Sequence, residues 1–171
     1  MGVLGLVLIL SSCTLAGFLY DNYENKRILQ LEELIKGLEI LKSEIDYKLT
    51  PLIYALEEVA DITGFGVDKL FNIFAYKLAQ KDEVNTMKMW KQSIVEVSGS
   101  LHLKEDDYKI LESFGSVAGH IDRELQKNNI DWVISKLRRK ADEATIRYEK
   151  QSKLYKGIGI LVGLSIVIVL I

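Results

Sequence analysis

The last third of the chain, Asp122–Ile171, reads DRELQKNNIDWVISKLRRKADEATIRYEKQSKLYKGIGILVGLSIVIVLI. No glycine or proline occurs between Gly119 and Gly157, so nothing in that span interrupts a helix. From Gly157 onward there is no charge, and Ser165 is the one strongly polar residue. The stretch therefore predicts an amphipathic helix that continues directly into a membrane segment. Its apolar face repeats every three or four positions, at Ile130, Val133, Leu137, Ala141, Ala144 and Tyr148.

A second apolar segment lies at the other end of the chain. Residues 1–20 include ten Val, Leu, Ile or Phe residues and no charge. A helix of that length spans about 30 Å, the thickness of a bilayer's hydrocarbon core. All 22 basic and 24 acidic side chains lie between Asp21 and Lys156. The pattern predicts two transmembrane helices, 1–20 and 157–171, with one hydrophilic domain, 21–156, between them.

The charges beside the two apolar segments predict their orientation. Lys26 and Arg27 follow the first segment on the side of the hydrophilic domain. Because Lys and Arg are enriched in cytoplasmic loops, we expect this domain to be cytoplasmic and both termini to face outward. The second segment is preceded by Arg147, Lys150, Lys153 and Lys156.

An alternative exists for the N-terminal segment. Its residues Leu10–Cys13 resemble a bacterial lipoprotein cleavage box, which would leave a lipoprotein anchored at Cys13. A cleavable signal peptide requires a basic residue near its start, and none precedes Lys26. We therefore prefer a retained transmembrane helix.

Turn signals divide the hydrophilic domain into helical stretches. The apolar stripe that leaves the first membrane segment runs to Leu49, and Thr50-Pro51 predicts a new helix with Thr50 as its N-cap and Pro51 as its first residue. The apolar face of this helix covers 52–62, further helices are predicted over 67–80, 84–97 and 105–117, and the last helix begins at Asp122. No alternating strand pattern occurs. The predicted fold class is all-α, a six-helix antiparallel bundle carried on two transmembrane helices.

The predicted core consists of the bulky residues of the separate apolar faces, because each face must pack against another. Truncation of a buried member such as Trp132 to alanine is expected to cost about 3–5 kcal/mol. The predicted core residues are Phe71, Phe74, Trp90, Leu111, Phe114, Trp132, Val133 and Leu137.

The sequence contains no motif that predicts catalysis, a cofactor or a metal. His120 and Asp122 offer two metal ligands, but no third ligand occurs at a suitable spacing. The segment Gly64–Gly66 is too short for a nucleotide-binding glycine loop. A net charge of −2 disfavours nucleic acid as a partner. We therefore predict a non-enzymatic protein.

Three segments of the chain, in order, match a known pattern. They are Leu41–Leu52 (LKSEIDYKLTPL), then Phe114–Gly119 followed by Asp122 and Gln126, then Lys156–Leu164. The first resembles the L-E-x-E-I-x-Y-x-x-T-P-L motif of the stage III sporulation protein AB family. The second is similar to that family's F-G-x-x-L-G segment with its later D-x-x-x-Q, and the third resembles its closing membrane segment.

The resemblance implies a membrane component of the channel-like complex that links mother cell and forespore in endospore-forming bacteria. It also implies kinship with the F-type platform proteins of type II secretion and type IV pilus systems. Their cytoplasmic domains are six-helix bundles that are thought to sit over a secretion-type ATPase. The implied partners are other stage III sporulation proteins, the ATPase of the same complex and the lipid bilayer, with the domain on the mother-cell side.

Two aspects of function stay open at this stage. A signal-transducing helical membrane protein is the alternative to a structural platform, although it would favour a continuous stalk over a separate helical core. Homo-oligomerisation is the other open question, since nothing in the sequence specifies the number of subunits.

The matched segments supply the candidate site residues Glu44, Tyr47, Asp122 and Gln126. We expect them to form a polar cluster near the turn after the first helix, or a surface for a partner. The competing interpretation is a surface glutamate, an ordinary tyrosine and a helix-capping aspartate.

The C-terminal apolar segment contains a second candidate contact. Gly159 and Gly163 form a G-x-x-x-G pattern, which lets two membrane helices approach closely. Ser12 and Ala16 are also four residues apart in the first segment and offer a matching face of small residues.

Overall fold

The computed structural model describes residues 3–80, 85–116, 118 and 122–170, with side chains from 22 to 150 except at those gaps and at Arg123. These residues form six α-helices, two short 3₁₀ helices and no strand, which confirms the all-α class. The 3₁₀ helices are η1 (Ser98–Ser100) and η2 (Ser113–Ser116). The α-helices are α1 (Val3–Asp46), α2 (Leu52–Ile62), α3 (Val67–Gln80), α4 (Thr86–Val97), α5 (Glu105–Glu112) and α6 (Arg123–Leu170).

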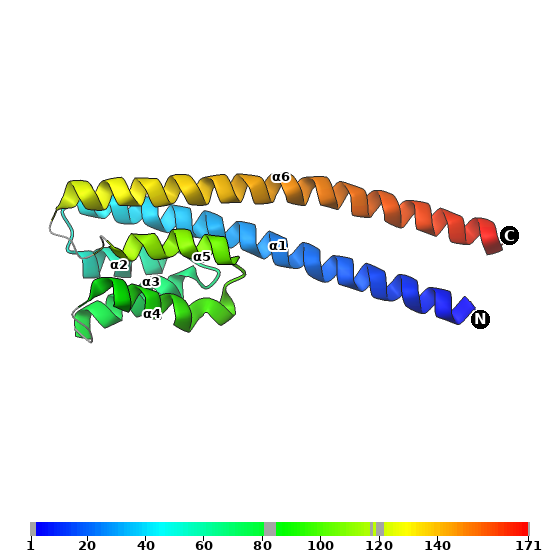
Figure 1. Cartoon of the computed structure of the whole chain (residues 1–171), viewed down its shortest axis with the longest axis horizontal. Coiled ribbons are helices and arrows are strands. Elements are labelled where there is room, and N and C mark those ends of the chain that lie inside the picture. Colours follow the sequence, from blue (N-terminus) through cyan, green and yellow to red (C-terminus); the bar gives the residue numbers. More distant parts are fainter. Residues whose placement is uncertain (1–2, 81–84, 117, 119–121, 171) are drawn as a thin grey trace.

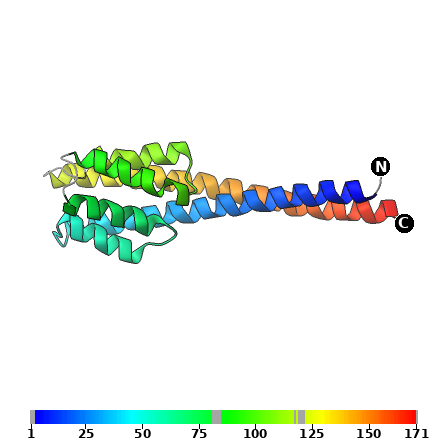
Figure 2. The same cartoon turned by 90° about the horizontal axis from the view of Figure 1, so that it is seen from below.

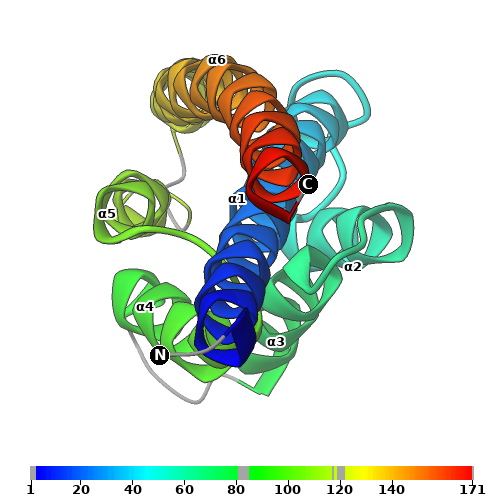
Figure 3. The same ribbon diagram turned by 90° about the vertical axis from the view of Figure 1, so that its right-hand side faces the viewer.

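Two long antiparallel helices, α1 and α6, extend far beyond the other four (Figure 1). Each helix contacts the next one in chain order, and α6 returns to pack against α1 (Figure 3). The short helices α2–α5 cover one half of the long pair, and both ends of the chain lie at the opposite end (Figures 1 and 2). The uninterrupted helix predicted from Asp122 through Gly157 is confirmed, because α6 runs without a break from Arg123 to Leu170.

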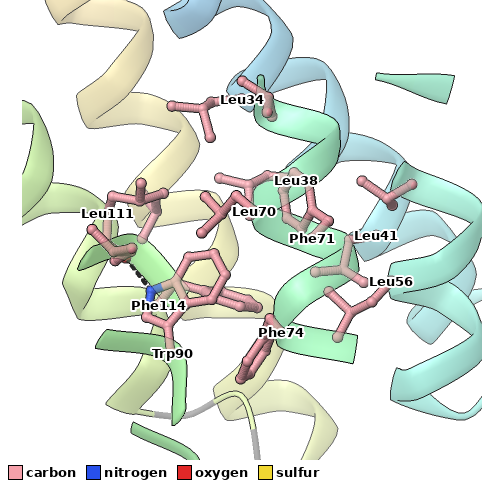
Figure 4. Close-up of a cluster of buried hydrophobic side chains, with 14 of the residues drawn as sticks. Leu34, Leu38, Leu41, Leu56, Leu70, Phe71, Phe74, Trp90, Leu111 and Phe114 are labelled. Carbon is pink, nitrogen blue, oxygen red and sulfur yellow. Dashed lines mark hydrogen bonds between the residues drawn. The ribbon is translucent and has the colours of Figure 1, made fainter. Parts of the chain in front are cut away.

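An aromatic cluster fills the centre of the bundle (Figure 4). The ring of Trp90 lies edge-to-face with the rings of Phe74 and Phe114, at 4.9 Å between centroids in each case. The indole Nε1 of Trp90 donates a hydrogen bond of 2.8 Å to the carbonyl oxygen of Leu111. This bond satisfies the polar atom of a fully buried side chain. All predicted core residues except Trp132 are buried, namely Phe71, Phe74, Trp90, Leu111, Phe114, Val133 and Leu137.

The assignment of Trp132 to the core was wrong. Its side chain is 46% exposed, and Lys136 lies over its ring with Nζ 5.6 Å from the centroid. The neighbouring Val133 is fully buried and belongs to the stripe of α6 that faces the bundle. Successive residues of a helix point about 100° apart, so Val133 and Trp132 cannot both face the same interior. The loss of stability from truncating Trp132 is therefore expected to be well below that of a core aromatic.

Two predicted helix boundaries also need correction. Pro51 is the N-cap of α2 and has extended backbone, with φ −56° and ψ 140°, so the helix begins one residue later than expected. Thr50 is not the cap, because its hydroxyl donates to Glu44 of the preceding helix. The helix predicted over 105–117 ends at Glu112 and is followed by η2.

In the parts of the chain where residues are described, no helix is both long and apolar enough to cross a membrane. The apolar segments 1–20 and 157–171 lie outside the region of described side chains. The two transmembrane helices, the contact at Gly159 and Gly163, and the anchor at Cys13 therefore stay predictions.

We expect Gly115→Ala to lower the free energy of unfolding by about 1–3 kcal/mol, the usual cost of overpacking a core. A Cβ at this position would lie 2.6 Å from Cδ1 of Trp90 and 2.9 Å from its Cβ. Gly99→Ala is the matched control, because a Cβ there would meet no atom within 4 Å. Urea denaturation of the full chain in a non-ionic detergent measures both. Equal stability of the two variants would contradict the tight packing around Trp90.

Candidate functional site

The turn between α1 and α2 has an unusual residue at its sharpest point. The amide of Thr50 donates a hydrogen bond of 3.0 Å to the carbonyl oxygen of Glu44, which closes the last turn of α1. Leu49, inside this closure, has a φ of +58°. Glycine is usual at such a position because a Cβ makes the left-handed conformation unfavourable. The leucine side chain is nevertheless 56% exposed, so core packing does not explain its presence.

The buried carboxylate of Glu44 stabilises this turn through its side-chain contacts. The residue is only 3% exposed and accepts a hydrogen bond of 2.9 Å from the hydroxyl of Thr50. It also forms an ion pair with Lys48, whose Nζ lies 3.6 Å from a carboxylate oxygen of Glu58. The hydrogen bond from Lys48 lowers the pKa of Glu44 despite the opposing effect of its desolvation, and Thr50 contributes in the same direction. Glu44 therefore positions the turn and presents little surface to a partner.

The other two candidate residues, Asp122 and Gln126, lie at the start of α6. Oδ1 of Asp122 accepts a hydrogen bond of 3.2 Å from the amide of Leu125, which caps the helix. Gln126 is 8% exposed, and its Nε2 donates a hydrogen bond of 3.0 Å to the carbonyl oxygen of Ala118. These contacts hold the beginning of α6 against Ala118, which follows η2.

The end of α1 and the start of α6 lie at the same end of the bundle (Figure 1). Glu44 and Tyr47 belong to or adjoin the first of these helix ends, and Asp122 and Gln126 the second. An ion pair of 3.1 Å between Lys127 and Asp46 joins the start of α6 to the end of α1. Lys42 and Asp131 form another ion pair between these two helices. Among the described hydrogen bonds and ion pairs, none joins Glu44 directly to Asp122 or Gln126. The candidate residues therefore share one end of the molecule, and the contacts given above place Glu44 in the turn after α1 and Asp122 and Gln126 at the start of α6.

Several large side chains at this end face solvent. We use the name distal tip for residues 46–54 together with residues 122–127. Tyr47 is 82% exposed, far more than an aromatic residue that serves packing. Tyr54 in the first turn of α2 is 64% exposed, and Leu125 is 50% exposed. Exposed aromatic and aliphatic side chains gathered at one end are typical of a protein-binding surface.

Sequence reasoning identified Tyr47 but missed Leu49 and Tyr54. It placed Leu49 on the apolar stripe of the first helix, because the spacing fits. The reversal of the chain at Leu49 turns that side chain away from the stripe. The Thr50-Pro51 signal indicated a boundary, and an apolar residue directly before it could have been considered as part of the turn.

A metal-binding or catalytic function has little support in the described residues. Within the described residues, no group of three or more His, Cys, Asp or Glu side chains is placed to hold a metal ion. The absence of an enzymatic activity and of a cofactor stays a prediction from the sequence.

Comparison with known proteins places the chain among sporulation proteins. A family profile described as stage III sporulation protein AB matches residues 2–171. The stage III sporulation protein AB of Bacillus subtilis (strain 168) is 31% identical over 168 residues, which cover 98% of both chains. A solved structure of a stage III sporulation protein AB (SpoIIIAB) superposes with a TM-score of 0.67 at 29% identity. The superposition covers 72% of this chain and 97% of that one.

We expect Leu49→Gly to raise the free energy of unfolding by about 1 kcal/mol, because glycine removes the steric cost of the left-handed backbone. Leu49→Ala is the control, since it removes the same exposed side chain but keeps the Cβ at a φ of +58°. Chemical denaturation of the full chain in detergent compares the three proteins. An equal gain in the free energy of unfolding for Leu49→Gly and Leu49→Ala would show that the exposed side chain, and not the left-handed backbone, destabilises the wild type.

We expect Glu44→Gln to lower stability at pH 7 and to have progressively less effect as the solution becomes acidic. The pKa of Glu44 lies below its ordinary value of 4.5, so its contribution is present above that value and is lost as the pH falls through the lower, folded-state pKa. Thermal unfolding from pH 7 to pH 3 measures the effect, with Glu57→Gln, an exposed carboxylate of α2, as control. A stability difference that does not change with pH would contradict this role of the Glu44 charge.

Proposed function

Because the chain belongs to the stage III sporulation protein AB family, we propose that it is a non-enzymatic membrane platform of the sporulation complex between mother cell and forespore. In this proposal two membrane helices hold the bundle at the mother-cell membrane. The distal tip binds the cytoplasmic ATPase of the same complex. The single observation that carries the proposal is the exposed, strained turn at the distal tip, at the end of the bundle farthest from the apolar segments.

The arrangement of the long helices supports a platform. Residues 3–20 and 157–170 of the apolar segments belong to α1 and α6, and both stretches are at the same end of the molecule (Figure 1). If that end is in the membrane, the bundle projects the distal tip into the cytoplasm. Helix length determines the reach, because residues 21–46 of α1 span about 40 Å at 1.5 Å per residue. A partner of the size of an ATPase can approach the tip without contacting lipid.

The composition of the distal tip supports a protein partner. Tyrosine is enriched among the residues that dominate binding energy, since it offers a large contact area with few rotatable bonds. Tyr47 and Tyr54 have this character, and Leu49 adds an aliphatic contact between them in the chain. The charged pair of Lys48 and Glu58 lies beside them and forms a polar rim.

The backbone strain at Leu49 strengthens this interpretation. A leucine in the left-handed region costs about 1–2 kcal/mol relative to a relaxed conformation. The side chain gains little from the fold because more than half of it is exposed. Strained residues often occur at functional sites, where another requirement offsets their cost. We propose that binding of a partner offsets the cost of the strained backbone at Leu49.

The membrane attachment rests on the sequence. The absence of charge in both apolar segments and the basic residues on the domain side favour two membrane helices with a cytoplasmic domain. Gly159 and Gly163 would then provide a close contact between membrane helices, either with the first segment or with another protein of the complex.

We expect Tyr47→Ala to weaken binding of the ATPase by about tenfold or more, the usual effect of truncating a central interface tyrosine. Tyr76→Ala is the matched control, because Tyr76 is 62% exposed on α3 and lies outside the distal tip. The measurement is the dissociation constant of the full chain in lipid nanodiscs with the purified ATPase. Binding should also weaken as salt screens the charged rim over about 8–10 Å.

Three outcomes would contradict the proposal. The first is equal binding by the wild type, Tyr47→Ala and Tyr76→Ala. The second is no binding at any ionic strength when both proteins are folded, which would leave only a role through the membrane segments. The third is hydrolysis of ATP by the chain in the absence of the ATPase, because the proposed platform performs no chemistry.

A further inference from the structure

A buried network of charges lies at the other end of the bundle, where α1 leaves it toward the apolar segment. Nε and Nη2 of Arg27 donate to the two carboxylate oxygens of Asp107, at 2.8 and 3.0 Å. Nη1 of Arg27 donates to Glu24 at 3.3 Å, and Lys104 forms an ion pair with the other oxygen of Glu24. Glu24 and Arg27 are 3% and 5% exposed, and Asp107 has no exposed surface. The network fixes the beginning of α5 against α1.

A cavity of about 140 Å³ opens beside this network, between α1, the beginning of α5 and α6. Its volume exceeds that of several water molecules, which occupy about 30 Å³ each in the liquid. A group of the size of a phosphate can therefore enter it. The residues that line the cavity are Arg27, Lys104, Asp106, Lys140, Glu143, Ala144 and Arg147.

The lining of this cavity is predominantly cationic. The four basic groups come from three different helices or their caps, and two carboxylates, Asp106 and Glu143, accompany them. Asp106 pairs with Lys140 at 3.2 Å but lies at the rim, with 67% of its side chain exposed. Glu143 lies 3.7 Å from Arg139, on the same helix. None of the described ion pairs includes Arg147. An anion in the cavity would therefore meet ammonium and guanidinium groups, of which Arg147 has no carboxylate partner among the described ion pairs.

The carboxylates behind the lining also affect which groups can bind. Glu24 and Asp107 accept hydrogen bonds from three nitrogen atoms of Arg27. This side chain therefore forms part of the cavity wall rather than a main donor to a ligand. Lys104 and Lys140 each have three N–H donors, and each makes one described carboxylate contact. The donors available to a ligand are therefore those of Lys104, Lys140 and Arg147. Several donors that converge from different directions suit the tetrahedral oxygens of phosphate better than a planar carboxylate.

We propose that this cavity is a binding site for a phosphate group, either the headgroup of an acidic phospholipid or a soluble phosphate compound. The position fits both sources. Arg27 is seven residues beyond Tyr20, or about 10 Å along the helix. The headgroup layer is about 5–8 Å thick on each side of the hydrocarbon, so the cavity opens just above it. The site is separate from the distal tip and does not depend on binding of the ATPase, and only its lipid form requires the membrane helices.

The test measures phosphate binding by the full chain in non-ionic detergent micelles. The broadening of the ³¹P resonance gives the affinity for two probes, inorganic phosphate and short-chain phosphatidylglycerol, with the chain as the titrant. Binding of phosphatidylglycerol alone identifies a lipid headgroup site, and binding of inorganic phosphate alone or of both identifies a site open to soluble phosphates. Absence of binding by both probes at millimolar concentration would overturn the proposal.

Variants then show whether the cavity is the site. Arg147→Gln is expected to weaken binding about tenfold, the scale of one charge-assisted hydrogen bond. Glu143→Gln should tighten binding severalfold, because it removes a negative charge from the lining. Arg138→Gln is the matched control on the same helix, since Arg138 pairs with Glu39 and does not line the cavity. It should leave affinity unchanged.

The variants also need a check of folding and a substitute variant. Far-UV circular dichroism checks that each variant is folded, and Lys140→Gln replaces Arg147→Gln if that variant is not. Equal weakening by the cavity variant and by Arg138→Gln would show general charge attraction and overturn the proposal. A Glu143→Gln variant that binds more weakly would overturn it as well.

Discussion

The burial of α1 is the constraint on which the rest of the structure depends. Leu31, Leu34, Leu38 and Leu41 have no exposed surface, and α2, α3 and α6 all pack against this helix. Gly37 allows Phe71 of α3 to approach α1 closely, because a Cβ there would lie 2.8 Å from Cε2 of Phe71. Short helices such as α5 are marginal in isolation and are stabilised by packing. Without the apolar surface of α1, the buried faces of α2, α3 and α6 would lose the helix against which all three pack.

The apolar interior is bounded at each end by buried charges. Glu44 closes the end at the distal tip, and the network around Arg27 and Asp107 closes the end toward the apolar segments. Replacing a buried ion pair with apolar residues is often neutral for stability, whereas its geometry can specify one arrangement of the chain. The charges here fix the turn that presents Tyr47 and the wall of the cavity that we assign to phosphate. The middle of the bundle thus provides stability, and its two ends carry the surfaces that we propose for interaction.

These two ends also explain why one small domain can have separate tasks. The distal tip carries exposed aromatic side chains, which suit a protein partner. The cavity near Arg27 is concave and lined by basic groups, which suits a small anion. The long helices α1 and α6 connect the two regions. The distal tip and the cavity share no residue, so the two proposals can succeed or fail independently.

The sequence by itself determined the helical class, the turns and most of the core. Helical periodicity is a local property, so the buried stripe of α6 and the aromatic residues of α3 and α4 could be identified from spacing alone. The family also followed from three short motifs, because their order along the chain is specific. Asp122 as a cap was predictable too, since capping involves only the next few residues.

Only the tertiary structure decided what depends on distant segments. Asp106 and Asp107 looked alike as acidic residues at the start of a helix, yet Asp107 is fully buried against Arg27, eighty positions away along the chain, and Asp106 is exposed. Leu49 fitted an apolar stripe by spacing, and Trp132 was assigned to the core because of its bulk. The turn at Leu49 and the packing of Val133 into the bundle instead leave both side chains exposed. A sequence pattern specifies which faces are apolar. The packing of those faces against each other decides which residues remain at the surface, such as Tyr47 and Leu49 at the distal tip, and which charges are buried, such as Arg27 beside the cavity.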